Sequence, residues 1–331
     1  MVFLYVLVTL VSTAIVWAGS DLLERSSERL ATHYGLPPIV QGAIIAAVGS
    51  SFPEFSSTVL STALHGEFAL GVGIITGSAI FNILVIPGIS GLVAGGSLQT
   101  SRDLVYKEAQ FYMLSVAALL LIFSFAVIYY PTDRLHGKVT RGLALFPLGL
   151  YCLYVFLQYM DTRDYEPEGA GAGEPWKEWG RLLLGMLFIL VGVEGLIRAA
   201  LAFGRIFNTP TFLWGVTVMA VATSIPDTFV SVKAARGGRG LPSLSNVLGS
   251  NIFDLLVCIP VGILIAGATA IDFSVAAPLL GFLVVATLTL FVFTRTHLCI
   301  TRLEAILLIL FYGVFLAWMT LETVGITSYV L

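Results

Sequence analysis

The sequence predicts an all-α, multi-pass membrane protein in which ten transmembrane helices form two inverted repeats of five helices each. Two observations carry this prediction. First, 57% of the 331 residues are hydrophobic and only 11% are charged, whereas soluble domains carry about 25% charged residues. Second, one polar motif occurs once in each half of the chain. The apolar segments are long and continuous, which is typical of spanning helices and differs from the alternating pattern of a β-barrel.

Ten apolar runs are long enough to cross the hydrocarbon core of a bilayer, which is about 30 Å thick. The first run starts at Met1 without a basic leader or a cleavage pattern of small residues, so we interpret it as a retained helix. The runs cover residues 2–20, 36–64, 68–95, 109–130, 142–159, 182–204, 211–232, 241–267, 273–294 and 303–322.

The longest hydrophilic stretch separates these runs into two groups of five. It extends from Asp161 to Glu178 and contains several acids, two prolines and a glycine-rich segment, a composition typical of a flexible linker. We therefore expect a first repeat over residues 1–160, a cytoplasmic linker over residues 161–178 and a second repeat over residues 179–331. Because five is odd, the second repeat is inverted in the membrane relative to the first.

Lysine and arginine are concentrated in alternate loops. If the N-terminus is outside, the inner connections carry twelve of these residues and the outer connections carry five. The positive-inside rule then predicts that both termini lie outside the cell membrane. The net charge of −3 and the lack of a basic patch with interleaved aromatic residues exclude nucleic acid as a partner.

The polar motif recurs at a fixed offset of 173 residues. Ser50-Ser51-Phe52-Pro53-Glu54 in the first half corresponds to Thr223-Ser224-Ile225-Pro226-Asp227 in the second. A second pair of segments, residues 77–82 and 249–254, matches at an offset of 172. The two halves are therefore interpreted as copies of one ancestral unit.

The first motif places a proline and an acid inside each of two spans. Proline removes a backbone donor and clashes with the preceding turn, so we expect these helices to kink or break and to expose carbonyl oxygens. Glu54 and Asp227 directly follow the prolines and would project into the gaps. A carboxylate within the membrane is costly unless it faces a partner or an ion.

The second motif adds polar side chains on one helical face in each half. Ser78 and Asn82 are four residues apart, as are Ser250 and Asp254, so each pair lies on one side of its helix. Carboxylates, hydroxyls, amides and free carbonyls form an all-oxygen ligand set, which suits calcium, sodium or potassium. No thiolate or imidazole cluster accompanies them, which argues against zinc and copper.

At these residues the chain resembles the cation/calcium antiporter superfamily, whose two repeats have the form G-[TSG]-S-x-P-[ED] followed by G-S-[NA]-x-x-[ND]. The resemblance covers both halves and implies exchange of sodium or protons for calcium across a membrane. It also implies that the first and sixth helices slide against a stationary bundle that carries the ligands. The metal ligands that it implies are Ser50, Ser51, Glu54, Ser78, Asn82, Thr223, Ser224, Asp227, Ser250 and Asp254, with Glu54 and Asp227 as the central calcium carboxylates.

Within that superfamily the chain is most similar to the potassium-dependent sodium/calcium exchangers. Three details carry this similarity: aspartate at position 227, the string over residues 77–82, and the string over residues 250–254 followed by Pro260. The similarity implies potassium cotransport, with Asp254 at the position tied to potassium. The chain departs from the usual pattern at Ser50 and Ala222, and it lacks the G-N-x-x-E pattern of the proton-coupled branch.

Together these observations predict a sodium/calcium antiporter that works by alternating access through a carboxylate-lined site near the bilayer midplane. Such a transporter is not an enzyme; the expected ligands are calcium, sodium and potassium ions, with no prosthetic group, and it is expected to function as a monomer in the bilayer without a protein partner. Two alternatives remain: a proton-coupled calcium/cation antiporter, and a cation channel whose pore is lined by the same acids and hydroxyls. An intramembrane hydrolase would need an activated nucleophile, and the span of Ser51 contains no histidine or lysine base.

Overall fold

The computed structural model describes residues 1–36, 45, 47–95, 97–102, 104–160, 175–323 and 327. In this part of the chain, eight helical segments are long and apolar enough to span a membrane, or nine if a bent helix pair is counted as one span. The eight are α1 (Val2–His33), α5 (Phe68–Val93), η2 with α6 (Leu104–Ala109 and Gln110–Tyr129), α7 (Arg141–Met160), α8 (Pro175–Phe207), α12 to α13 (Gly240–Phe253, η4 Asp254–Cys258 and Ile259–Ala266), α14 (Phe273–Arg295) and α15 (Arg302–Thr323).

These segments coincide with eight of the ten predicted spans, and the bent pair coincides with a ninth. The remaining span was predicted over residues 36–64, of which residues 37–44 lie outside the described part; it contains α3 (Ala47–Ser50) and α4 (Phe52–Ala63). The mostly helical multi-pass fold is confirmed, whereas the count of ten remains a prediction. Of the predicted linker, residues 161–174 are not described, and Pro175 begins α8, a position that suits proline.

The bent pair shows how the first motif shapes the backbone. The segment α9 (Thr211–Trp214), η3 (Gly215–Met219) and α10 (Ala220–Thr223) meets α11 (Ile225–Arg236) at an angle of 42°. In the first half, α3 and α4 are separated by Ser51, just as α10 and α11 are separated by Ser224. The predicted breaks are confirmed, but they precede the prolines, because proline is tolerated in the first turn of the helix that follows.

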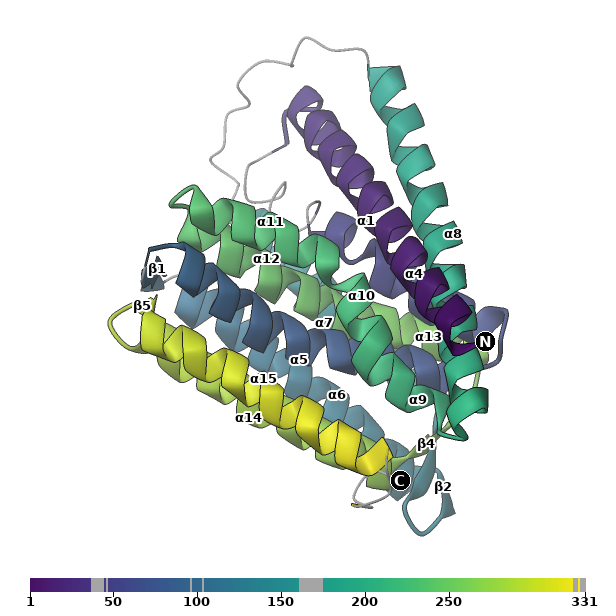
Figure 1. Cartoon of the computed structure of the whole chain (residues 1–331). Helices are drawn as coiled ribbons and strands as arrows, with labels where there is room; N and C mark the ends of the chain where they lie inside the picture. Colours follow the sequence, from purple (N-terminus) through teal and green to yellow (C-terminus); the bar gives the residue numbers. More distant parts are fainter. Residues whose placement is uncertain are drawn as a thin grey trace.

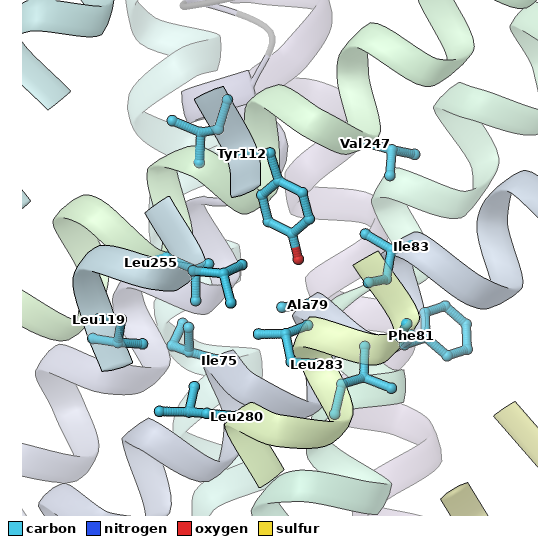
Figure 2. Packing of buried hydrophobic residues seen from close by; sticks show 14 of the residues in the cluster. Ile75, Ala79, Phe81, Ile83, Tyr112, Leu119, Val247, Leu255, Leu280 and Leu283 are labelled. Carbon is cyan, nitrogen blue, oxygen red and sulfur yellow. The ribbon is translucent and has the colours of Figure 1, made fainter. Parts of the chain in front are cut away.

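Helix α5 lies near the centre of the bundle and is almost entirely buried. Figure 1 shows it between the layer of α11 and α12 and the layer of α14 and α15. Apolar side chains of α5, α6, η4 and α14 pack together around it, as Figure 2 shows. The labelled members of this core are Ile75, Ala79, Phe81, Ile83, Tyr112, Leu119, Val247, Leu255, Leu280 and Leu283.

Helices α1 and α8 lie side by side along one flank of the bundle (Figure 1). Small residues let their backbones approach closely. A Cβ atom on Gly19 would lie 2.8 Å from the carbonyl oxygen of Gly185, and a Cβ on Gly192 would lie 2.9 Å from the carbonyl oxygen of Ser12. Larger side chains would therefore force the two helices apart.

Five short strands lie at the ends of the described helices, and two of their pairings join the two halves. Strand β1 (Ser97–Gln99) pairs antiparallel with β5 (Cys299–Thr301), and β3 (His136–Val139) pairs with β2 (Pro131–Asp133) and β4 (Thr269–Asp272). Residues 97–99 and 269–271 are related by the offset of 172. The strands β1 and β4 follow α5 and α13, which belong to the third span of each half. Each of these strands thus pairs with a strand of the other half, as expected of two related units.

Candidate functional site

The residues predicted from the two motifs come together in one buried cluster. The helix breaks at Ser51, between α3 and α4, and at Ser224, between α10 and α11, supply hydroxyls and two acids. Helices α5, α12 and η4 supply the facing side chains. None of the ten side chains is more than 2% exposed. The ten are Ser50, Ser51, Glu54, Ser78, Asn82, Thr223, Ser224, Asp227, Ser250 and Asp254.

Ser78 and Asn82 of α5 connect the two carboxylates that follow the prolines. The Ser78 hydroxyl donates to Glu54 Oε1 at 3.2 Å and lies 2.8 Å from the Ser224 hydroxyl. The Asn82 amide donates to Asp227 Oδ2 at 3.2 Å. One face of a first-half helix therefore contacts the acid of its own half and the acid of the other half.

Ser250 of α12 makes the corresponding contacts in the second half. Its hydroxyl donates to Asp227 Oδ1 at 3.2 Å and lies 3.1 Å from the Ser50 hydroxyl. The Ser51 hydroxyl donates to the Ser250 carbonyl oxygen at 3.4 Å. Each of the two facing serines, Ser78 and Ser250, thus binds the acid of its own half and a hydroxyl of the other half.

Asp254 and Thr223 are fully buried members of the cluster that also bond to groups of their own helices. Asp254 begins η4, accepts a weak hydrogen bond from the Cys258 thiol at 3.7 Å, and interacts electrostatically with Glu54 and Asp227. The Thr223 hydroxyl donates to the carbonyl oxygens of Met219 and Ala220 in its own helix at 3.2 and 3.3 Å. Its side chain thus satisfies carbonyl oxygens next to the break and also interacts with Glu54.

Two asparagines were not among the predicted ligands. Asn251 accepts a hydrogen bond from the Asn82 amide and donates one to the Ala79 carbonyl oxygen, both at 3.1 Å. Asn246 donates to Asp227 Oδ1 at 3.3 Å. Both could have been found from spacing, since Asn246 lies four residues before Ser250 and Asn251 lies within the second motif, but their first-half counterparts are apolar.

Several oxygens of the cluster are buried without a hydrogen-bond partner. Among the described residues these oxygens are all acceptors, whereas the amide groups of Asn82, Asn246 and Asn251 have partners for their N–H donors. A buried polar atom without a partner costs about 1–3 kcal/mol. The unpaired oxygens are Glu54 Oε2, Asn82 Oδ1, Asn246 Oδ1 and Asp254 Oδ2.

This excess of acceptors favours a positively charged ligand. Glu54, Asp227 and Asp254 also repel one another electrostatically, and a cation would offset that repulsion. Within the described part of the chain, no three His, Cys, Asp or Glu side chains form a metal-binding group. A cation in this cluster would therefore draw many of its ligands from hydroxyl and amide oxygens, as hard cations do.

A cavity of about 1390 Å³ lies beside the cluster, between α1, η2, α7, α11 and α12. Its wall includes Pro226, which precedes Asp227 in the chain, and Asn246, which donates a hydrogen bond to Asp227. The wall also carries Lys233, Arg236 and Arg239, which belong to loops and helix ends predicted to be cytoplasmic. The cavity therefore lies next to neighbours of Asp227, at the lysine- and arginine-rich end of the bundle.

Comparison with known proteins finds relatives along most of the chain. The family model described as sodium/calcium exchanger protein matches residues 4–160 and 177–321. The sodium/calcium exchanger MaX1 of Methanosarcina acetivorans is 25% identical, with 94% of this chain and 97% of that protein covered. Human sodium/potassium/calcium exchanger 4 is 33% identical over 43% of this chain and 21% of its own length.

The fold is also similar to that of a solved exchanger. The sodium-calcium exchanger NCX_Mj, soaked with 10 mM Na⁺ and no Ca²⁺, superposes with a TM-score of 0.68 at 25% identity, and 96% of this chain and 99% of that chain are covered. The family model covers most of both halves, and the cluster lies within the matched residues. The protein therefore belongs to the sodium/calcium exchanger family of integral membrane antiporters.

Proposed function

We propose that the protein exchanges sodium for calcium by alternating access through the cluster around Glu54 and Asp227. The observation that carries this proposal is the set of buried acceptor oxygens without partners, which converge from both halves of the chain. We assign the ten clustered residues as cation ligands, with Glu54 and Asp227 in the central role. This assignment names the side chains that would bind the exchanged ions.

A shared site explains how two opposite ion fluxes are coupled. Ser78 binds Glu54 and Asn82 binds Asp227, so an ion that engages one carboxylate sits among groups that also hold the other. Calcium and sodium then compete for the same oxygens. Without a cation, the carboxylates repel one another in a medium that screens charge poorly, so the loaded states pass between the two orientations more readily than the empty state.

We assign α1 and α8 as the moving pair of this cycle. They contact each other through glycine and serine backbones, while α5, α12 and the strand pairs connect the two halves around the site. Sliding of α1 and α8 against this bundle would change which end of the site is open. The cavity between α1 and α11 corresponds to the state open toward the lysine- and arginine-rich end.

The remaining features of the proposal concern topology. Figure 1 shows that α1 begins and α15 ends at the same end of the bundle, which supports an even number of crossings and hence α3 with α4 as the tenth. The two segments matched by the family model support a division into repeats over residues 1–160 and 179–331. The site is complete within one chain, so the proposed unit is a monomer in the cell membrane with both termini outside.

Potassium is the proposed cotransported ion, with Asp254 as its carboxylate ligand. Asp254 Oδ2 is buried without a hydrogen-bond partner, which leaves an oxygen for a second cation. The relative that is 33% identical is named a sodium/potassium/calcium exchanger, which supports the same assignment.

Calcium uptake into vesicles tests the proposal. Vesicles loaded with sodium should accumulate radiolabelled calcium when external sodium is low, and Glu54→Gln or Asp227→Asn should abolish uptake. Full exchange in either variant would contradict the site assignment. Uptake that a proton gradient drives equally well would favour the proton-coupled alternative. Single-channel currents would favour a cation channel. Equal uptake rates with and without potassium would exclude potassium cotransport.

A further inference from the structure

The cavity gives the two central carboxylates different surroundings. Among the described residues, its wall includes Asn246 and Pro226 beside Asp227, but no residue of the first-half motif over residues 50–54. An ion in this cavity therefore reaches the cluster from the Asp227 side. The side chain that lies both in the cavity wall and in contact with Asp227 is Asn246.

The amide of Asn246 is held in one orientation. Its nitrogen donates to Asp227 Oδ1 at 3.3 Å and to the Ser231 hydroxyl at 3.4 Å. The residue is 6% exposed, and its oxygen Oδ1 has no hydrogen-bond partner. An amide oxygen is a good ligand for hard cations, and its lack of a partner is a cost that a cation would remove.

The first half has no equivalent of this residue. Asn246 corresponds to Ile74 at the offset of 172 that relates the second motifs. Ile74 is fully buried and packs in an apolar cluster with Leu70 and Ile189. Symmetry between the halves therefore fails here, because an isoleucine side chain supplies no oxygen ligand.

The cavity wall carries charges of both signs: the acids are Asp21, Glu24, Glu28 and Glu108, and the bases are Arg25, Lys107, Lys233, Arg236 and Arg239. Glu24 of α1 lines the cavity and interacts electrostatically with Asp227 and with the basic group of Lys233. The base next to Glu24, Arg25, is paired with Asp21 at 2.7 Å. The charge of Arg25 is thus offset locally, and Glu24 is an acid of the cavity wall that interacts electrostatically with Asp227.

We propose that Asn246 Oδ1 is a further cation ligand, which receives the ion from the cavity before the ion reaches Asp227. This proposal rests on the proposed exchange function. The protein then binds its cation with different affinity on its two faces, because the cavity face has an amide ligand where the other half has hydrocarbon. Asn246 is a specificity-determining residue in this proposal, and its two amide atoms have separate roles: the nitrogen positions Asp227 and the oxygen binds the ion.

Two substitutions separate these roles. Asn246→Leu removes both amide atoms at nearly constant size, whereas Asn246→Asp removes the donor but keeps acceptor oxygens. Ser243→Ala is the matched control, since Ser243 is a buried polar residue of the same helix whose hydroxyl bonds to Ser90 at 3.2 Å and not to the site. Each variant is compared with the wild type for the calcium concentration that gives half-maximal uptake from each face.

Everted and right-side-out vesicles present opposite faces to the calcium. The cavity face is identified by an Arg239→Cys variant, because Arg239 lines the cavity and a membrane-impermeant thiol reagent should inhibit this variant from one side only. The wild type controls for Cys152, Cys258 and Cys299. We expect Asn246→Leu to raise the half-saturating calcium concentration about tenfold on the cavity face. The rise on the opposite face should be smaller, because only the lost bond from the nitrogen to Asp227 acts there, and Ser243→Ala should change neither face.

Asn246→Asp should bind calcium on the cavity face at least as tightly as the wild type. If Asn246 only positions Asp227 through its nitrogen, both variants weaken binding equally and on both faces, which overturns the proposal. Terbium binding to the purified protein, read as tryptophan-sensitised luminescence, keeps the test independent of transport. Unchanged terbium affinity in Asn246→Leu also overturns the proposal. If the leucine variant does not fold, weakened terbium affinity in Asn246→Asp overturns it instead. Absence of exchange in the wild type contradicts only the proposed function.

Discussion

The Asn82 amide donates a 3.2 Å hydrogen bond to Asp227 Oδ2, so a residue of the first half holds the acid of the second half. The same nitrogen also donates to Asn251 Oδ1 at 3.1 Å, while Asn82 Oδ1 has no partner. Asn82 therefore uses its donors to fix the protein and leaves its acceptor for a cation. The same division between donors and acceptors recurs at Asn246 and supports the proposal that the cluster binds a cation.

Asn82→Leu tests this relationship. The substitution removes a hydrogen bond to a charged group, which contributes about 1.5–3 kcal/mol, so we expect the half-saturating calcium concentration to rise by about ten- to hundredfold. Radiolabelled calcium uptake measures the effect. Ser90→Ala in the same helix is the control, because Ser90 is buried but contacts Ser243; an equal loss in both variants would indicate a defect of helix packing instead.

Ser78 and Ser224 should act as one unit. Their hydroxyls are 2.8 Å apart although they come from different halves. In a double-mutant cycle, Ser78→Ala and Ser224→Ala should show an interaction energy of about 0.5–3 kcal/mol in calcium binding. The pair Ser78→Ala and Ser243→Ala serves as the control and should be additive. Additivity in both cycles would contradict direct contact across the halves.

Gly19→Leu should stop exchange by separating α1 from α8. A Cβ atom at Gly19 would lie 2.8 Å from a backbone oxygen of Gly185 and 2.9 Å from side-chain atoms of Phe188 and Ile189, and backbone cannot move aside cheaply. Gly180→Leu in α8 is the control, since a Cβ there meets nothing within 4 Å. Sodium-driven calcium uptake and thermal unfolding are measured together. Wild-type exchange in Gly19→Leu would argue against close packing of the moving pair.

Glu24→Gln should weaken calcium uptake from the cavity face only. Glu24 is partly exposed and interacts electrostatically with Asp227. A charge of this kind contributes about 0.2–1 kcal/mol, so we expect an about two- to fivefold rise in the half-saturating concentration. The effect should shrink at high ionic strength, because salt screens such charges. Glu67→Gln is the control: Glu67 does not line this cavity and accepts a hydrogen bond from Thr211. A salt-independent change in Glu24→Gln would point to altered packing.

The helical class and the positions of most spans could be predicted because they depend on local chemistry. A run of apolar residues without charges is stable in a bilayer only as a helix that satisfies its own backbone, whatever its neighbours are. The helix breaks at Ser51 and Ser224 were predictable for the same reason, since Pro53 and Pro226 cannot continue a preceding helix. Each break lies two residues before its proline, because proline is tolerated in the first turn of a helix.

The residues of the site could be predicted only where the two halves repeat each other. Glu54, Asp227, Ser78 and Ser250 have polar counterparts at the fixed offsets, so repetition marked them. Asn246 and Asn251 correspond to Ile74 and Ala79, and repetition therefore gave no reason to select them. Their importance follows from contacts with Asp227 and Asn82, which no spacing within the chain specifies.

The amino-acid sequence by itself determined a membrane-spanning helical protein with two broken, acid-bearing helices and an all-oxygen ligand chemistry, because hydrophobicity, proline and side-chain type act over one or two turns. Tertiary structure decided that Ser78 meets Ser224, that Asn82 holds Asp227, and that the cavity is lined by Asn246, which contacts Asp227. These contacts join residues about 145 positions apart in the chain. They depend on how α5, α11 and α12 pack against one another, and packing is a property of the assembled bundle.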